Sequence, residues 1–247
     1  RALERVQRLL RSKNSLAFFV MFSIPTFLFV VAVQSRIAAT EATGPLDPYL
    51  PEAFVEPSAV AVDMPRLGAV LLIFVAFYMG SYVAMVVTRT FYHGYDWGDV
   101  PREVYTEDVV VSSLNFTLAS LTFIPLFFIA LALFILPGAF IAISFAFYAV
   151  YISIGGEGYI DSFMKSWGFS RGRRLPLLML FGAFLLGMIF IGAVGLVLYV
   201  VVWNVSTVVA ELMLAFGLAA LLVFTLAVVT STFVTLGPEG VDVEPES

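Results

Sequence analysis

The sequence predicts an all-α protein: a polytopic membrane bundle of six transmembrane helices, with amphipathic helices at the cytoplasmic interface. Hydrophobic residues make up 61% of the 247 positions and charged residues only 13%, against roughly 45–50% and about 25% in soluble domains. Six apolar runs are long enough to cross a bilayer. Short amphipathic stretches precede three of these runs, as expected of helices that lie in the headgroup plane.

Composition excludes several classes of function. The chain has no cysteine and a single histidine, His93, so we expect no thiolate site, no metal and no cofactor. The net charge of −5 comes from loops and the tail, which argues against nucleic acid as a partner. Arginine outnumbers lysine and the polar segments are acidic, an archaeal-like composition compatible with a salt-adapted source.

A membrane span needs about 20 predominantly apolar residues. The chain has six such segments, at about 16–34, 67–87, 116–136, 138–154, 177–203 and 208–236. Leu136-Pro137-Gly138 joins the third to the fourth, and because proline and glycine break helices, these two spans are expected to be antiparallel neighbours. Residues 1–236 are thus predicted to form one membrane domain, followed by an acidic cytoplasmic tail over 237–247.

Basic residues in short loops predict the orientation, because they stay preferentially on the cytoplasmic side. Eleven lysines and arginines fall on one side of the six spans, and two, Arg36 and Arg66, on the other. Both termini are therefore expected in the cytoplasm and the acidic loop 37–65 outside, in a multi-pass protein of the cell membrane. The first span follows five basic residues, as a secretory signal would, but its length and its poor cleavage site favour an anchor.

An amphipathic stretch precedes each odd-numbered span. The second of these covers 101–114, and the third is 157–174, "EGYIDSFMKSWGFSRGRR". The apolar faces comprise Leu3, Val6 and Leu10 in the first, Val104, Val111 and Leu114 in the second, and Tyr159, Ile160, Phe163 and Trp167 in the third. The likeness of "SIPTFLF" around Pro25 to "FIPLFFI" around Pro125 fits either an internal repeat of this unit or chance.

The sequence holds few signs of chemistry. It has no HExxH, no Gly-x-Ser-x-Gly, no paired intramembrane aspartates and no Walker-type loop, so we expect no catalytic residue and no enzyme activity. His93 lies near Asp96 and Asp99, but the aromatic residues around it favour an interfacial belt over a weak cation site. Glu211 is the intramembrane polar candidate. Its place near the external start of the sixth span favours an interfacial or helix N-terminal charge over a transport pathway.

Segment 157–174 contains the candidate residues for lipid-headgroup interaction. They are Lys165, Trp167, Arg171, Arg173 and Arg174. Each cation near an anionic leaflet is worth about 1 kcal/mol of attraction. The alternative is that these residues act only as topogenic anchors.

The stretch "ILPGAFIAISFAFYAVYISIGGEGYIDSFMKSWGFSRGRR" resembles a family of six-helix membrane proteins of unknown function from haloarchaea and bacteria. It is also similar to the membrane domain fused to some bacterial glycerophosphodiester phosphodiesterases. The matching features are Pro137-Gly138, the small-residue fourth span, Glu157-Gly158, Ser166-Trp167 and Arg171-Gly172. The resemblance implies six membrane helices, and the phosphodiesterase activity is not carried over.

We therefore expect a non-enzymatic integral membrane protein, a structural or accessory component that contacts lipid headgroups or a protein partner. The alternative is a small transporter or permease whose pathway runs between the proline-containing first and third spans. A lipid-modifying enzyme that uses loop carboxylates is a further alternative. Small residues such as Ala183 and Gly187 permit close helix approach, so the expected partners are membrane lipids, a second copy of the chain or another membrane protein.

Overall fold

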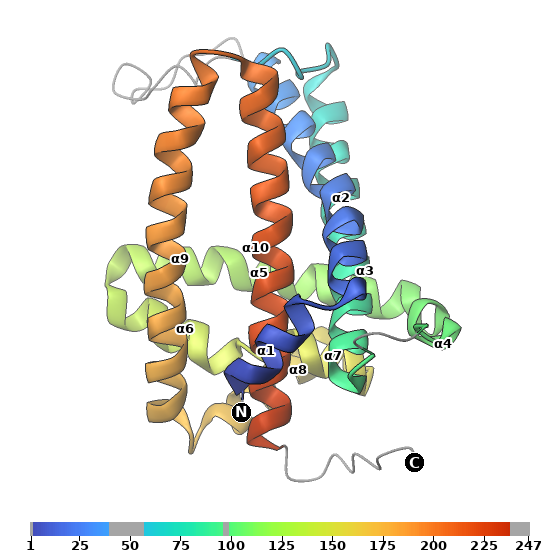
Figure 1. Cartoon of the computed structure of the whole chain (residues 1–247), viewed down its shortest axis with the longest axis vertical. Coiled ribbons are helices and arrows are strands. Elements are labelled where there is room, and N and C mark those ends of the chain that lie inside the picture. The colour runs from blue at the N-terminus through green and yellow to red at the C-terminus, as the bar shows by residue number, and fades with distance from the viewer. Residues whose placement is uncertain (1, 40–56, 96–98, 238–247) are drawn as a thin grey trace. The chain divides into compact units, whose positions relative to one another are not determined.

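The computed structural model describes residues 2–39, 57–95 and 99–237, and all regular secondary structure in these ranges is helical (Figure 1). Most of the predicted external loop and nearly all of the predicted tail lie outside the described residues. The helices are α1 (Ala2–Leu10), α2 (Lys13–Ala38), α3 (Arg66–His93), α4 (Arg102–Thr106), α5 (Val109–Leu133), α6 (Ile135–Phe145), α7 (Tyr148–Gly155), α8 (Tyr159–Ser170), α9 (Arg174–Trp203) and α10 (Thr207–Leu236).

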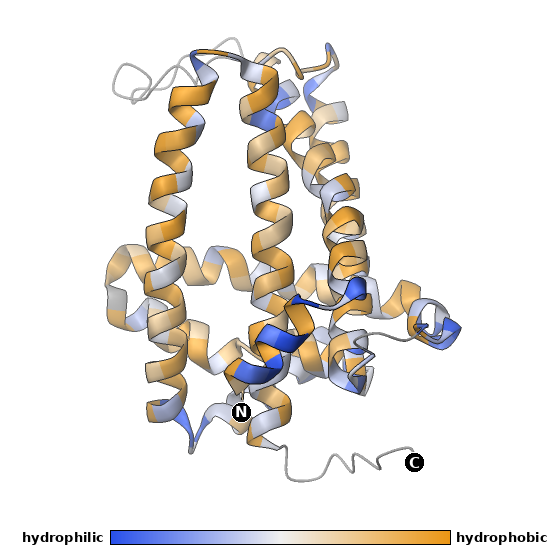
Figure 2. Cartoon of the chain, viewed as in Figure 1, coloured by the Kyte–Doolittle hydropathy of each residue, from blue (hydrophilic) through white to orange (hydrophobic). Residues whose placement is uncertain are grey.

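Six described helical segments are long and apolar enough to cross a membrane, which confirms the predicted fold class. Five are the single helices α2, α3, α5, α9 and α10, and α6 and α7 together make the remaining one, Leu136–Gly155. Large apolar side chains on them remain exposed, with Leu186 at 70% and Phe190 at 71%. Such a surface suits contact with lipid rather than water, and Figure 2 shows the long helices as largely hydrophobic along their length.

The chain divides into two compact units. Unit 1 comprises Arg1–Leu16, Ala84–Gly182 and Phe224–Ser247, and unit 2 comprises Ala17–Val83 and Ala183–Val223. The long helices α2, α3, α9 and α10 each contribute residues to both units. Each unit contains one of the two polar arrangements described below.

Unit 1 contains α1 and α4 to α8, together with one end of each of the four long helices. α5 and α6 are direct neighbours, as predicted, and α8 packs against α6 and α7. An aromatic core joins α7, α8 and α10 around Phe233, whose ring centroid is 5.0 Å from that of Phe169 and 5.3 Å from that of Tyr151. This core fixes the position of α8 within the unit.

The reversal between α5 and α6 lies earlier than predicted. Phe134, with φ −162° and ψ 153°, is the extended residue between the two helices. Pro137 and Gly138 fall instead in the first turn of α6. Proline is tolerated there because the first-turn N–H groups of a helix have no intrahelical acceptor.

The prediction of a single amphipathic helix over 101–114 is wrong, because two helices, α4 and α5, share this range. Asp108 has a left-handed backbone, with φ 47°, and it separates α4 from α5. Val104 is buried, whereas Val111 and Leu114 are 62% and 48% exposed. The three residues do not share a buried face, because the span of α5 already begins at Val109.

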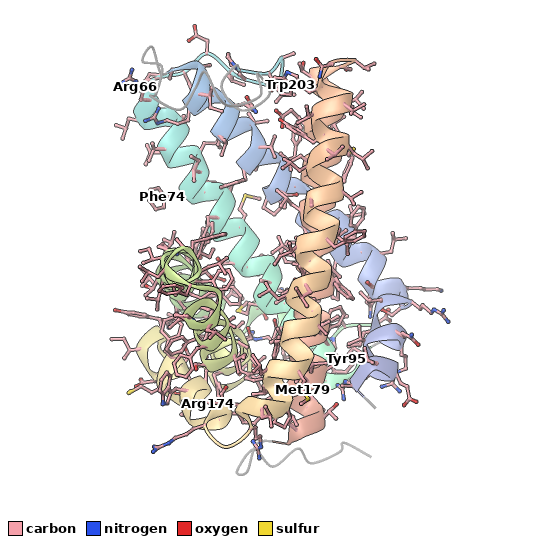
Figure 3. The ribbon with its side chains drawn as sticks, turned by 90° about the vertical axis from the view of Figure 1, so that its left-hand side faces the viewer. Arg66, Phe74, Tyr95, Arg174, Met179 and Trp203 are labelled. Atoms are coloured by element: carbon pink, nitrogen blue, oxygen red, sulfur yellow. The ribbon has the colours of Figure 1, made fainter. Side chains whose placement is uncertain are left out.

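Unit 2 holds the remaining parts of α2, α3, α9 and α10 and the segment 57–65. α2 meets α3 where a Cβ on Gly80 would lie 4.0 Å from Pro25, so this proline lies at a close helix contact. α9 and α10 form a hairpin whose turn is closed by the N–H of Ser206 on the carbonyl of Val202, at 2.8 Å. In Figure 3, Arg66 and Trp203 lie at the same end of this unit.

The structure shows no close approach within unit 2 at the glycines of the fifth span. Cβ atoms placed on Gly187, Gly192 and Gly195 of α9 would meet no described atom within 4 Å. A contact of these small residues with a second copy of the chain stays a prediction.

Candidate functional site

A row of buried serines runs along α8, and two of them, Ser166 and Ser170, bond to backbone groups of neighbouring elements. Ser162, Ser166 and Ser170 are spaced four residues apart and are all 0% exposed. The hydroxyl of Ser166 donates to the carbonyl of Ser144 (3.0 Å) and accepts from the N–H of Phe147 (3.1 Å). These backbone groups belong to the junction where α6 ends and α7 begins, so α8 satisfies polar groups that the break in the span leaves free.

The exposed side of α8 carries apolar residues next to the charged Asp161 and Lys165. Ile160 is 56% and Met164 is 61% exposed. The ring of Phe163 is T-shaped to that of Phe145 and the ring of Trp167 is tilted to it, with centroid distances of 5.1 and 5.8 Å. A helix with a buried polar edge and an exposed apolar face suits the headgroup region of a bilayer.

The turn from α8 to α9 carries Arg171, Arg173 and Arg174, which we call the arginine corner. Figure 2 shows this turn as hydrophilic next to the largely hydrophobic α9, and Arg174 lies where α9 begins (Figure 3). The guanidinium carbon of Arg174 lies 4.8 Å from the Phe140 ring centroid and 4.9 Å from that of Trp167. Such cation–π contacts contribute about 0.5–1 kcal/mol each and hold the guanidinium in place.

The arginine corner retains capacity for an anion. Nε of Arg174 is buried and has no hydrogen-bond partner among the described residues, and Arg171 is exposed. The N–H groups of Arg174 and Leu175 open the 30-residue helix α9 and have no intrahelical acceptor. Together with the positive end of the helix dipole, these donors form a site suited to a negatively charged group.

Lys165, a predicted lipid-headgroup residue like the three arginines, differs from them because it forms an ion pair. Its side chain is 51% exposed and its Nζ pairs with the carboxylate of Glu157. No such ion pair is found for the arginine corner in the described part of the chain. The structure thus brings Trp167 to the arginine corner, whereas the charge of Lys165 is offset by Glu157.

Arg5 and Arg89, which the sequence analysis used only to predict the membrane orientation, also bind backbone carbonyls. A terminal nitrogen of Arg5 donates to the carbonyls of Phe91 (2.9 Å) and Tyr92 (3.0 Å) in the last turn of α3. Nε of Arg89 donates to the carbonyl of Ser153 at 2.7 Å. A basic side chain at a helix C-terminus satisfies carbonyls that lack a partner in the helix.

Glu211 belongs to a second arrangement, in unit 2. Its side chain is 0% exposed. Oε1 accepts hydrogen bonds from Nε2 of Gln34 (2.6 Å) and from the hydroxyl of Tyr199 (3.1 Å). Oε1 of Gln34 in turn accepts from the N–H of Ser58 at 3.0 Å. Gln34 therefore links α2, α10 and the segment 57–65.

This environment differs from that of a water-exposed interfacial charge. Oε2 of Glu211 and the hydroxyl of Ser58 are buried and have no hydrogen-bond partner among the described residues. Sequence reasoning singled out Glu211 but missed Gln34, Ser58 and Tyr199. Gln34 and Tyr199 are polar groups in the last turns of apolar spans, which is a weak signal, and nothing in the sequence pairs residues 177 positions apart.

His93 lies among aromatic rings. Its ring is T-shaped to that of Tyr92, with centroids 5.3 Å apart, and tilted to that of Tyr95 at 5.8 Å. Asp96, which the weak cation site would need, lies outside the described residues.

Six helical segments of the described chain that are long and apolar enough to cross a membrane define a multi-pass helical membrane protein. The chain belongs to the family described as "Domain of unknown function (DUF7847)", which matches residues 65–237. Searches of curated proteins and of solved structures gave no significant match.

Proposed function

We propose that this chain is a non-enzymatic protein of the cell membrane that binds the headgroups of anionic lipids through the arginine corner. The observation that carries the proposal is the set of guanidinium groups at the start of α9. Those of Arg173 and Arg174 lie over aromatic rings, all three are close in sequence to the N-terminus of α9, and no carboxylate pairs with them in the described chain. A phosphate group is complementary to such a donor set.

The surroundings favour a lipid over a soluble anion. Leu175 and Met179 in the first turns of α9 are 65% and 68% exposed, and Ile160 and Met164 expose the apolar side of α8. A ligand with an anionic head and apolar chains matches this combination of charge and apolar surface.

The proposed orientation places both termini and the arginine corner in the cytoplasm. Its support is the excess of basic residues on one side of the spans, eleven against two. Cytoplasmic leaflets that carry anionic lipids attract juxtamembrane arginines.

The resemblance of residues 135–174 to the membrane domain of some glycerophosphodiester phosphodiesterases stays a prediction from the sequence, and such a relationship would fit a role beside phospholipid headgroups. The phosphodiesterase activity itself is not proposed. The transporter alternative needs a pathway between Pro25 of α2 and Pro125 of α5, which belong to different units, and it stays a prediction. A homo-oligomer or a protein partner likewise stays a prediction.

Native mass spectrometry of the full chain in detergent tests the proposal. An anionic phospholipid and a zwitterionic phospholipid of the same chain length are titrated separately. The variant R171Q/R173Q/R174Q should bind the anionic lipid about tenfold more weakly or worse, because each cation contributes about 1 kcal/mol and a tenfold change is about 1.4 kcal/mol.

The matched control is R11Q/K13Q/R102Q, which removes three positive charges from exposed positions on the same predicted side. It should retain most of the affinity. Equal losses in the two variants would mean that binding follows net charge only, and equal binding of both lipids would contradict the proposal.

A further inference from the structure

The carboxyl group of Glu211 has no positively charged partner among the residues that the structure describes. Its side chain is 0% exposed, and those of Gln34 and Tyr199 are each 5% exposed. The groups that act on it are Tyr199 of α9, Gln34 of α2 and Ser58 of the segment 57–65, and none of them carries a positive charge. Outside the described ranges, Arg1 is the only basic residue in the sequence.

An ionised carboxylate in this place would be poorly compensated. Removing a carboxylate from water costs several kcal/mol unless a counter-charge or a full set of donors replaces the water. The dipole of α10 contributes little, because the helix begins at Thr207 and the effect fades beyond the first turn. The nearby N–H of Ala210 is already bonded to the carbonyl of Ser206, at 3.1 Å.

We propose that Glu211 is a proton-binding site and that Oε2 of its carboxyl group carries one proton in the folded protein. Oε1 is the acceptor of both donated hydrogen bonds, which leaves Oε2 as the protonated oxygen. The hydroxyl group of Ser58 lies close to this carboxyl and is buried, and it has no hydrogen-bond partner among the described residues. A small shift of the Ser58 side chain would make it the acceptor, so that one proton satisfies both buried oxygens.

A proton suits this site better than a metal ion. A hard cation takes about six or more oxygen ligands. Around Glu211, the described residues offer two buried oxygens without a partner, Oε2 and the hydroxyl of Ser58.

The bound proton supports the attachment of the segment 57–65. This segment is held to α2 by the N–H of Ser58 on Gln34 and by the N–H of Val62 on the hydroxyl of Ser35, at 3.0 and 2.9 Å. Ionising Glu211 places a buried charge beside the first of these bonds. While Glu211 is protonated, the folded state holds one proton more than the unfolded state, in which this carboxyl is ionised at neutral pH. Stability therefore falls as the pH rises. This site lies in unit 2 and does not depend on lipid binding by the arginine corner.

Infrared spectroscopy of the full chain in lipid vesicles tests the proposal. At neutral pH the wild-type protein should show the C=O stretch of a protonated carboxylic acid, above the amide I band and shifted down in D₂O. The band should be absent in Glu211→Gln and present in Glu103→Gln, a control at an exposed carboxylate of α4. Replacing sodium by choline should leave it unchanged.

A wild-type spectrum without this band overturns the proposal, and it requires no variant to fold. A band that appears only when sodium is removed also overturns it, and assigns the site to a metal ion. As a second measurement, the midpoint of thermal unfolding of the wild-type protein should fall more steeply with rising pH than that of Glu211→Gln. Parallel pH profiles would count against the bound proton.

Discussion

At the scale of single residues, Gly138 shows how closely α5 and α6 approach each other. A Cβ at this position would lie 2.9 Å from the Cα of Leu131, closer than side-chain carbons approach backbone atoms. The obstacle is backbone, so a rotamer change cannot relieve it. Gly138 thus permits the tight hairpin that carries the α6–α7 junction to which α8 is anchored.

Replacing Gly138 by alanine should therefore lower the free energy of unfolding by about 1–3 kcal/mol, the usual cost of overpacking. The control is Gly182→Ala in α9, where a Cβ would meet no described atom within 4 Å. The free energy of unfolding of both variants is measured in mixed micelles with increasing amounts of denaturing detergent. Equal stability of the two variants would refute the close approach.

At the scale of elements, α8 is held by hydroxyls as well as by aromatic rings. Ser166 bonds across to the α6–α7 junction, whereas the hydroxyl of Ser162 donates to the carbonyl of Tyr159 within its own helix, at 2.7 Å. Both serines are 0% exposed, but only Ser166 satisfies backbone groups of another element.

Ser166→Ala should accordingly destabilise the docking of α8 by about 1–3 kcal/mol, because it leaves the buried N–H of Phe147 without its acceptor. Ser162→Ala should cost clearly less. Hydrogen exchange of the amides in residues 159–170 reports the difference as faster exchange in Ser166→Ala. Indistinguishable exchange in the two variants would show that the serine bonds do not hold α8.

The sequence predicted the membrane spans but not the breaks between helices, for physical reasons. Long apolar runs indicated the spans, since a bilayer imposes their length and composition. The reversal at Phe134 and the left-handed Asp108 were missed, because proline tolerates a first helical turn and because tertiary contacts select such backbone states. The break between α6 and α7 was also missed, because its compensating serines lie in α8.

At the scale of the whole molecule, residue types indicated candidate sites but not their partners. The basic residues of the arginine corner are adjacent in the sequence and could be predicted together. The aromatic ring of Phe140 and the partners of Glu211 come from distant segments, and the fold alone brings them into contact.

The proposed binding of anionic lipids requires that the arginine corner faces the cytoplasmic leaflet and that the α9–α10 turn faces the opposite side of the membrane. Because the chain contains no cysteine, single cysteines at Gly172 and Val205 report each position cleanly. Gly172 is exposed with open space around it, and Val205 is 84% exposed. The most direct measurement is labelling with a membrane-impermeant thiol reagent in intact cells and in inverted vesicles. Gly172→Cys should react only in inverted vesicles and Val205→Cys only in intact cells. Labelling of Gly172→Cys from outside intact cells would contradict the cytoplasmic position of the arginine corner.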